Sequence, residues 1–118
     1  MEKKNIIKDK TFEFAKDIVY LYKDLADKKE FVLSKQLLRS GTSIGANVRE
    51  AEHAQSKADF IHKLSIALKE ANETEYWIDL LFETGFITEE CFQKIKFKTV
   101  EILKLLISII NTSKNNNY

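Results

Sequence analysis

Apolar side chains recur every three or four residues over four long stretches of this 118-residue chain, the spacing that marks one face of an α-helix. The pattern predicts helices over about residues 10–26, 31–54, 57–84 and 89–111. The segments between them are short, and short connectors bring successive helices side by side in opposite directions. We therefore predict an all-α fold, an antiparallel up-down-up-down four-helix bundle that forms one domain over residues 1–118. Residues 112–118 are polar with nothing to bury, so we expect a disordered tail.

Residues typical of helix ends support these boundaries. Ser56 is a good N-cap for the third helix, with Asp59 three residues later in the capping-box position. Gly85 suits the left-handed position that ends this helix, and Thr88 is a suitable N-cap for the fourth.

Two glycines lie inside the second predicted helix. Gly41 and Gly45 each cost about 1 kcal/mol of helix stability relative to alanine. The apolar positions Leu37, Ile44 and Val48 nevertheless keep helical register across both glycines. We predict one continuous helix whose glycines let a neighbouring backbone come close.

Composition narrows the class of protein. The chain has three glycines and no proline, which favours long helices. Its net charge of +1 creates no global field for nucleic acid or anionic membrane. Cys91 is the single cysteine, so a reducing compartment is expected. The N-terminus lacks the apolar core of a signal peptide, and the most apolar run, Ile102 to Ile110, is too short to span a bilayer. We expect a soluble, cytoplasmic protein.

Catalytic and metal-binding patterns are weak. Glu50 and His53 have the Glu-x-x-His spacing of di-iron bundles, but such sites need this pair on two helices. A cysteine nucleophile would require Cys91 to meet His53 or His62, and a cysteine in the first turn of a helix more often packs. We assign no catalytic residue, metal or cofactor, and we expect no enzyme.

A polar stripe lies beside the apolar stripe of the second helix, formed by Arg39, Ser43, Asn47 and Glu50. One interpretation is a buried network that fixes helix register, with Arg39 paired to a carboxylate such as that of Glu50, Glu70 or Glu73. The other is a contact with a ligand or nucleic acid. We prefer the structural role.

A second stripe, on the third helix, combines apolar and acidic residues: Ile66, Glu70, Glu73 and Trp77. We interpret it as a surface that faces a neighbouring subunit, because Trp and Arg are common interface anchors. Lys35, Arg39 and Arg49 are candidate nucleic-acid contacts. Further lysines could extend a basic patch around these helices: Lys57, Lys63 and Lys69.

Three segments closely resemble one bacterial family. They are Arg39-Ser-Gly-Thr-Ser-Ile-Gly-Ala-Asn-Val-Arg-Glu50, Ser56-Lys-Ala-Asp-Phe60 and Ile66-Ala-Leu-Lys-Glu-Ala-Asn-Glu-Thr-Glu-Tyr-Trp77. They resemble the 23S ribosomal-RNA intervening-sequence proteins, whose Ser-Ile-x-x-Asn-x-x-Glu core is matched by residues 43–50, and Glu73 also matches. The resemblance implies a left-handed bundle that assembles into a ring, typically a pentamer, with no enzymatic activity. The related accessory proteins of diversity-generating retroelements bind nucleic acid and contact the reverse transcriptase.

Three functions are consistent with these observations. The first is a non-catalytic, homo-oligomeric bundle that serves as a binding or scaffold module, with RNA or DNA as the ligand implied by the resemblance. The second is a protein-binding adaptor without nucleic-acid contact. The near-neutral charge favours this adaptor, because the retroelement accessory proteins are strongly basic. The third is a metal-dependent enzyme, which bound iron or manganese would reveal.

Overall fold

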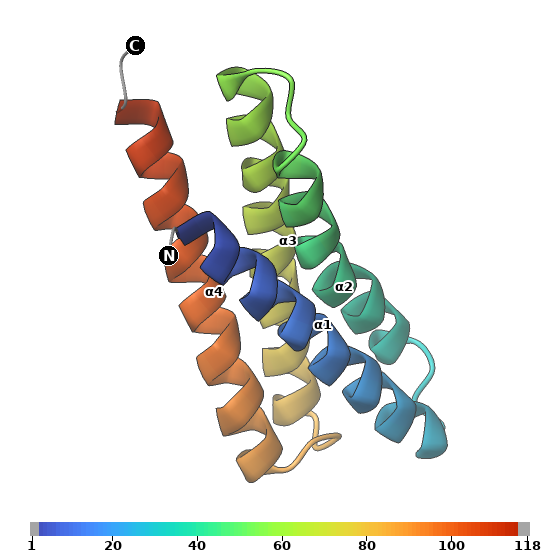
Figure 1. Ribbon diagram of the computed structural model, residues 1–118. Helices are drawn as coiled ribbons and strands as arrows, with labels where there is room; N and C mark the ends of the chain where they lie inside the picture. Colours follow the sequence, from blue (N-terminus) through green and yellow to red (C-terminus); the bar gives the residue numbers. More distant parts are fainter. Residues whose placement is uncertain (1–2, 116–118) are drawn as a thin grey trace.

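Four helices make up the structure, a computed structural model that describes the backbone of residues 3–115 and the side chains of residues 6–115. They are α1 (Lys3–Asp27), α2 (Leu33–Ala51), α3 (Lys57–Glu83) and α4 (Glu89–Asn115), and they run alternately up and down (Figure 1). Each helix packs against two neighbours, in the cyclic order α1, α2, α3, α4. The predicted all-α, antiparallel four-helix bundle is confirmed.

Four of the predicted helix boundaries need correction: the start of α1, both ends of α2 and the end of α4. α1 begins at Lys3 rather than near residue 10, because Ile7 adds another buried turn to its apolar stripe. α2 is shorter than predicted, Leu33–Ala51 rather than 31–54. α4 continues to Asn115, so residues 112–115 are helical and not a disordered tail. The buried Ile109 and Ile110 hold this end of the helix against the core. The prediction for residues 116–118 lies outside the described residues.

The start of α2 is set by a carboxylate that the sequence pattern did not reveal. The Glu30 side chain accepts hydrogen bonds from the backbone N–H groups of Ser34 (2.7 Å) and Leu33 (3.1 Å). Partial burial acts to raise the pKa of Glu30, but the hydrogen bonds from Ser34, Leu33 and Val32 outweigh it and lower this pKa. Glu30 thus satisfies N–H groups that the first turn of any helix leaves free.

The helix caps predicted from the sequence are confirmed. Ser56 Oγ accepts a hydrogen bond from the Asp59 N–H (3.0 Å), and Thr88 Oγ1 accepts one from the Cys91 N–H (3.1 Å). Gly85 has a φ of 84° and follows the end of α3. The N–H of Phe86 reaches back to the Leu81 carbonyl, which closes the α3 C-terminus.

The two internal glycines let α1 approach α2 closely, and α2 is continuous through both, as predicted. A Cβ atom added to Gly45 would lie 3.2 Å from the Thr11 backbone oxygen. A Cβ atom added to Gly41 would lie 2.8 Å from Ile18 Cγ1. Gly41 therefore has no room for a side chain unless Ile18 moves, whereas at Gly45 the Thr11 backbone would have to yield by a few tenths of an ångström.

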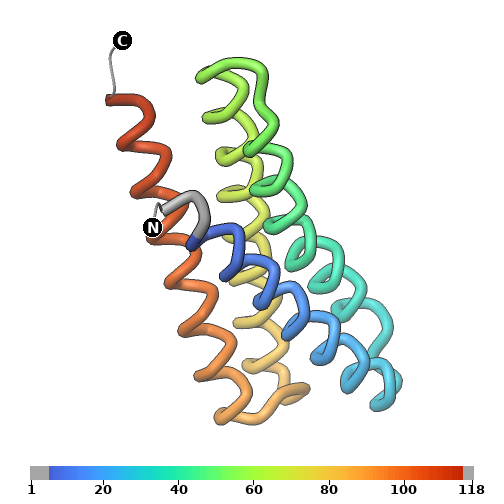
Figure 2. Tube along the Cα trace, in the orientation of Figure 1, coloured from blue at the N-terminus to red at the C-terminus, as the bar shows by residue number. Residues whose placement is uncertain are grey.

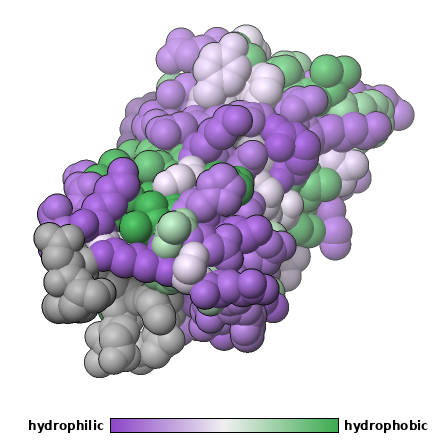
Figure 3. Space-filling view, turned by 90° about the horizontal axis from the view of Figure 1, so that it is seen from above, coloured by the Kyte–Doolittle hydropathy of each residue, from purple (hydrophilic) through white to green (hydrophobic). Residues whose placement is uncertain are grey.

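The core runs the length of the bundle, and ion pairs at its surface join α1 to α4, α2 to α3 and α3 to α4. Lys8 of α1 pairs with Glu52, the residue that follows α2. The buried residues include Phe14, Ile18, Leu37, Ile44, Ile78, Leu81, Ile102 and Leu106. The end of the molecule drawn in Figure 3 is mostly hydrophilic, with small apolar areas between polar ones. No helix of the described residues is long and apolar enough to cross a membrane.

Candidate interaction site on α2 and α3

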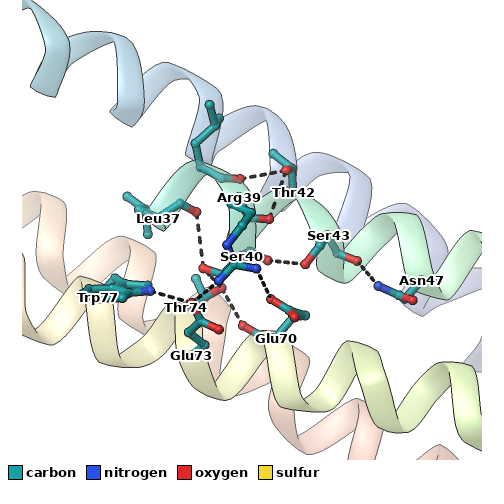
Figure 4. Close-up of polar contacts among 11 residues, drawn as sticks. Leu37, Arg39, Ser40, Thr42, Ser43, Asn47, Glu70, Glu73, Thr74 and Trp77 are labelled. Carbon is teal, nitrogen blue, oxygen red and sulfur yellow. Dashed lines mark hydrogen bonds and ion pairs between the residues drawn. The ribbon is translucent and has the colours of Figure 1, made fainter. Parts of the chain in front are cut away.

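Arg39 of α2 reaches across to α3 and is held by two carboxylates. Its Nη1 donates to Glu70 Oε1 (3.2 Å), and its Nη2 donates to Glu73 Oε2 (Figure 4). Glu70 and Glu73 are three residues apart, so they share one face of α3. A guanidinium held at two points has a fixed position and orientation.

Glu73 also accepts a hydrogen bond from the indole of Trp77, with a distance of 3.0 Å between Nε1 and Oε2. Trp77 is partly buried and meets the Tyr76 ring edge to face, with centroids 5.0 Å apart. We call Arg39, Glu70, Glu73 and Trp77 the Arg39 cluster. The structure brings these four predicted residues together in one hydrogen-bonded group.

The cluster lies at the edge of the α2–α3 seam rather than in the core. The Arg39 side chain is 52% exposed, whereas those of Glu70 and Glu73 are 15% and 30% exposed. The predicted buried network is therefore a surface network.

Electrostatics keep the cluster charged. The Trp77 hydrogen bond, followed by the Arg39 hydrogen bond, lowers the pKa of Glu73. The hydrogen bond to Glu73 raises the pKa of Arg39. The Arg39–Glu73 ion pair is consequently maintained throughout the neutral pH range.

Three other predicted residues do not join the cluster. Ser43 Oγ donates to the Ser40 carbonyl (3.0 Å), and Asn47 Nδ2 donates to the Ser43 carbonyl (2.8 Å), so both bond to their own helix. Glu50 forms an ion pair with Lys63 of α3 (3.2 Å). The polar stripe of α2 thus divides into Arg39, two residues that bond locally and Glu50, which makes a separate bridge.

The candidate nucleic-acid residues lie along the exposed side of α2 without converging. Arg39 is already paired with two carboxylates. The Arg49 guanidinium lies 5.6 Å from the centre of the Phe12 ring of α1. Lys35 is exposed, and no carboxylate among the described side chains pairs with it. Lys35 and Arg49 are 14 residues apart, or about 21 Å along a helix.

A buried polar contact lies beside the cluster and was not predicted. Ser40 and Thr74, next to Arg39 and Glu73 in the sequence, are both inaccessible to solvent, and their hydroxyl oxygens are 2.9 Å apart. Thr74 is three residues after Ala71 and four before Ile78, both in the core stripe. That register is a signal in the sequence that could have identified Thr74 as buried.

The structure does not assemble the catalytic group considered from the sequence. Cys91 lies at the end of the bundle where α4 starts, whereas His53 and His62 flank the α2–α3 connector at the opposite end (Figure 1). Burial, and then the charge of Asp24, raise the pKa of Cys91, which disfavours a thiolate. Among the described side chains, those of residues 6–115, no three from His, Cys, Asp or Glu are grouped to hold a metal ion.

The fold and this site define an antiparallel four-helix bundle with a polar surface network across two helices. The family model of the 23S rRNA-intervening sequence protein matches residues 3–108. The chain belongs to this family, which confirms the resemblance found in the sequence. It is similar to a protein of unknown function from the S23 ribosomal protein family of Bacteroides thetaiotaomicron VPI-5482. That crystal structure is 65% identical, with a TM-score of 0.92 over 93% of this chain and 99% of the other. No curated protein matches the chain.

Proposed function

We propose that the chain is a non-catalytic bundle that associates with copies of itself and serves as a binding or scaffold module. The observation that carries this proposal is the Arg39 cluster, in which an arginine and a tryptophan are held at the surface by shared carboxylates. Trp, Tyr and Arg are the residues most often found as energetic anchors of protein interfaces. The α2–α3 edge offers all three: Arg39 comes from α2, and Tyr76 and Trp77 come from the next turn of α3 after Glu73.

Preorganisation makes this edge suitable for association. Arg39 and Trp77 are already fixed by hydrogen bonds, so less side-chain entropy is lost when a partner covers them. Tyr76, which is 59% exposed, supplies apolar area beside them. Ile66 lies on the same side of α3, about 16 Å away along the helix. The row from Ile66 to Trp77 therefore forms a mixed apolar and charged strip, as expected of a subunit contact.

Light scattering coupled to size exclusion tests the proposal. We expect the wild-type mass to be a multiple of 13.7 kDa, five-fold if the assembly is the ring that the family resemblance implies. The Tyr76→Ala/Trp77→Ala variant should shift toward the monomer. Phe97→Ala, which removes an aromatic side chain on α4 that is 71% exposed, is the control and should leave the mass unchanged. A wild-type protein that is monomeric at micromolar concentration would refute self-association.

Nucleic-acid binding is a second candidate, favoured by one groove. Between α1 and α2 lies a groove of about 420 Å³ whose lining includes Lys8, Phe12 and Arg49. The Phe12 side chain is 50% exposed. The Lys16 ammonium lies 5.7 Å from the centre of its ring, and the Arg49 guanidinium lies 5.6 Å from it. Exposed aromatic rings among cations are the features with which proteins stack bases and contact phosphates.

Titration of labelled structured RNA and single-stranded DNA, at low and near-physiological salt, tests this candidate. Binding that persists at the higher salt and weakens at least about tenfold in Lys16→Glu/Arg49→Glu, which reverses the two cations beside the Phe12 ring, would support it. Lys104→Glu/Lys114→Glu, which reverses two exposed lysines on α4, is the control with the same change in net charge. Equal loss in both variants would indicate nonspecific attraction. No binding at either salt concentration would favour the protein-binding adaptor.

A further inference from the structure

The groove between α1 and α2, which we call the α1–α2 groove, is lined by residues that remain accessible to solvent. None of the eight lining residues is buried. Four of them are small: Ala15, Thr42, Gly45 and Ala46. The surface is hollow because these short side chains do not fill the space between the two helices. Because α2 contacts α1 on one side and α3 on the other, this groove and the Arg39 cluster flank the same helix (Figure 2).

We infer that the α1–α2 groove receives α3 of a second copy of the chain, over the stretch from Glu70 to Trp77. We call this stretch the α3 strip. The inference names the partner surface of the proposed self-association and therefore rests on it. Since the strip and the groove lie on different sides of the bundle, the contact is head-to-tail. Each copy uses its strip on one neighbour and its groove on another.

The two surfaces match in length and in the size of their side chains. The α3 strip advances seven residues along α3, and the groove advances seven along α1, from Lys8 to Ala15. Each distance is about 10 Å at the α-helical rise. One end of the strip carries two aromatic rings, those of Tyr76, which is 59% exposed, and Trp77. One end of the groove is lined by Ala15 and Thr42, whose short side chains leave room for such rings.

The opposite ends of the two surfaces carry opposite charge. Lys8 and Arg49 line the other end of the groove. Lys8 already pairs with a carboxylate, but Arg49 forms no ion pair with any described side chain and lies beside an aromatic ring. At the other end of the strip, Glu70 and Glu73 share the single cation of Arg39, so one negative charge is in excess. An uncompensated arginine on one copy thus complements an uncompensated carboxylate on the next.

Two neighbouring charges do not alter this balance. Glu50 also lines the cationic end of the groove, but it is paired with Lys63 of α3. Lys69, one turn before Glu73, is exposed and forms no ion pair with any described side chain.

Charge and size together fix the direction of the contact. The acidic end of the strip lies toward Arg49, and its aromatic end lies toward Thr42. Because the groove runs from Lys8 to Ala15 in the chain direction of α1, α3 of one copy lies parallel to α1 of the other. α1 and α3 have the same direction within one bundle, so the two bundles point the same way.

Two variants that each remove one surface test the inference by light scattering coupled to size exclusion. Ala46→Trp fills the groove at an exposed position and keeps the strip. Tyr76→Ala/Trp77→Ala removes the aromatic end of the strip and keeps the groove. Each variant alone should shift toward the 13.7 kDa monomer, with its helical circular dichroism retained. An equimolar mixture should recover a complex of two chains, because one intact strip then meets one intact groove. Ala58→Trp, at an exposed alanine near the start of α3, is the control and should leave the wild-type mass unchanged.

Cross-linking gives a second readout in a Cys91→Ser background, which contains no other cysteine. Ala46→Cys places a thiol in the groove, and Lys69→Cys places one at an exposed position beside the strip. A short bis-maleimide should join the two variants when they are mixed, and neither variant to itself. Adding Arg49→Glu to the Ala46→Cys chain should lower the cross-linked yield, whereas adding Lys104→Glu should not.

The outcomes separate this inference from the proposed function. A monomeric wild type would refute self-association and the inference together. An oligomeric wild type whose mass Ala46→Trp leaves unchanged would overturn the inference alone. So would a mixture of the two variants that stays monomeric, or a cross-link that forms as readily within one cysteine variant as between the two. If Ala46→Trp weakened the binding of RNA but left the mass unchanged, the groove would serve nucleic acid instead of a second copy.

Discussion

The hydroxyl oxygens of Ser40 in α2 and Thr74 in α3 lie 2.9 Å apart inside the bundle, with neither residue accessible to solvent. Thr74 Oγ1 is also 2.7 Å from the carbonyl oxygen of Glu70, whereas Ser40 Oγ has only a 3.5 Å approach to the Leu37 carbonyl. The two residues are the sequence neighbours of Glu73 and Arg39. A satisfied pair of buried hydroxyls therefore sets the register of α2 against α3 directly beside the Arg39 cluster (Figure 4).

Removing one hydroxyl of this pair should lower the unfolding free energy more when the remaining hydroxyl has no other good hydrogen-bond partner. Thr74→Val keeps the shape of the side chain but leaves Ser40 with its long contact alone, so we expect a loss of about 1–3 kcal/mol of unfolding free energy. Ser40→Ala should cost about 1 kcal/mol or less, because Thr74 still bonds to the Glu70 carbonyl. The double variant should cost less than the sum. Urea unfolding followed by circular dichroism measures all three, and additive losses would contradict the coupling.

Gly41 should resist substitution although it lies within a helix. Gly41→Ala gains about 1 kcal/mol of helix propensity. Its Cβ, however, would lie 2.8 Å from Ile18 Cγ1 and 2.9 Å from Cγ2, at the branch point of a fully buried side chain. We expect a net destabilisation of about 1–3 kcal/mol from overpacking. In an Ile18→Ala background the added methyl should be neutral or stabilising, since it enters the vacated space. Equal effects in both backgrounds, measured by thermal unfolding, would disprove this explanation.

The fold was predictable because the sequence features that define each helix are local: the spacing of its apolar residues and the residue types at its ends. The register of Leu37, Ile44 and Val48 holds across two glycines, and Ser56, Thr88 and Gly85 stop or start helices as their types suggest. The errors arose where the outcome depends on three-dimensional contacts. Glu30 caps α2 from a distance of three and four residues, and burial of Ile7 extends α1, neither of which the apolar spacing reveals.

The candidate site was predictable as a set of residues but not as a geometry. The spacing of Glu70, Glu73 and Trp77 identified one side of α3. Arg39 was expected to pair with a carboxylate such as that of Glu50, Glu70 or Glu73, and it pairs with the last two. Periodicity does not fix how far a stripe lies from the helix–helix contact. For that reason Ser43 and Asn47, on the same stripe as Arg39, bond to their own backbone instead. The burial of Ser40 and Thr74 likewise depends on how each helix is rotated about its own axis, which periodicity does not fix.

Two positions that follow helices have positive φ, and they should respond oppositely to substitution. Lys29, after α1, has φ 68°, and Gly85, after α3, has φ 84°. A side chain is strained in this region and glycine is not. Lys29→Gly should therefore stabilise the protein by up to about 1 kcal/mol, and Gly85→Ala should destabilise it by about 1 kcal/mol. Apart from its chain neighbours, no atom lies within 4 Å of the Cβ position at Gly85, so the cost there comes from the local backbone conformation and not from tertiary packing. Thermal unfolding measures both, and Lys28→Gly is the control that should give no gain.

Glu73 should link the stability of the α2–α3 edge to pH. Because the Trp77 and Arg39 hydrogen bonds lower its pKa in the folded state, its contribution is present above the ordinary glutamate pKa of about 4.3 and is lost as pH falls through the folded value. The difference in unfolding free energy between wild type and Glu73→Gln should be largest at neutral pH and shrink toward pH 3. Urea unfolding across this range measures it, and a carbon NMR titration locates the pKa. Glu50→Gln, which breaks an exposed pair with Lys63, should change stability by no more than about 0.5 kcal/mol at neutral pH. If the difference in unfolding free energy stayed constant with pH, or if the Glu73 carboxyl titrated at its ordinary pKa, the cluster would not stabilise the ionised form of Glu73.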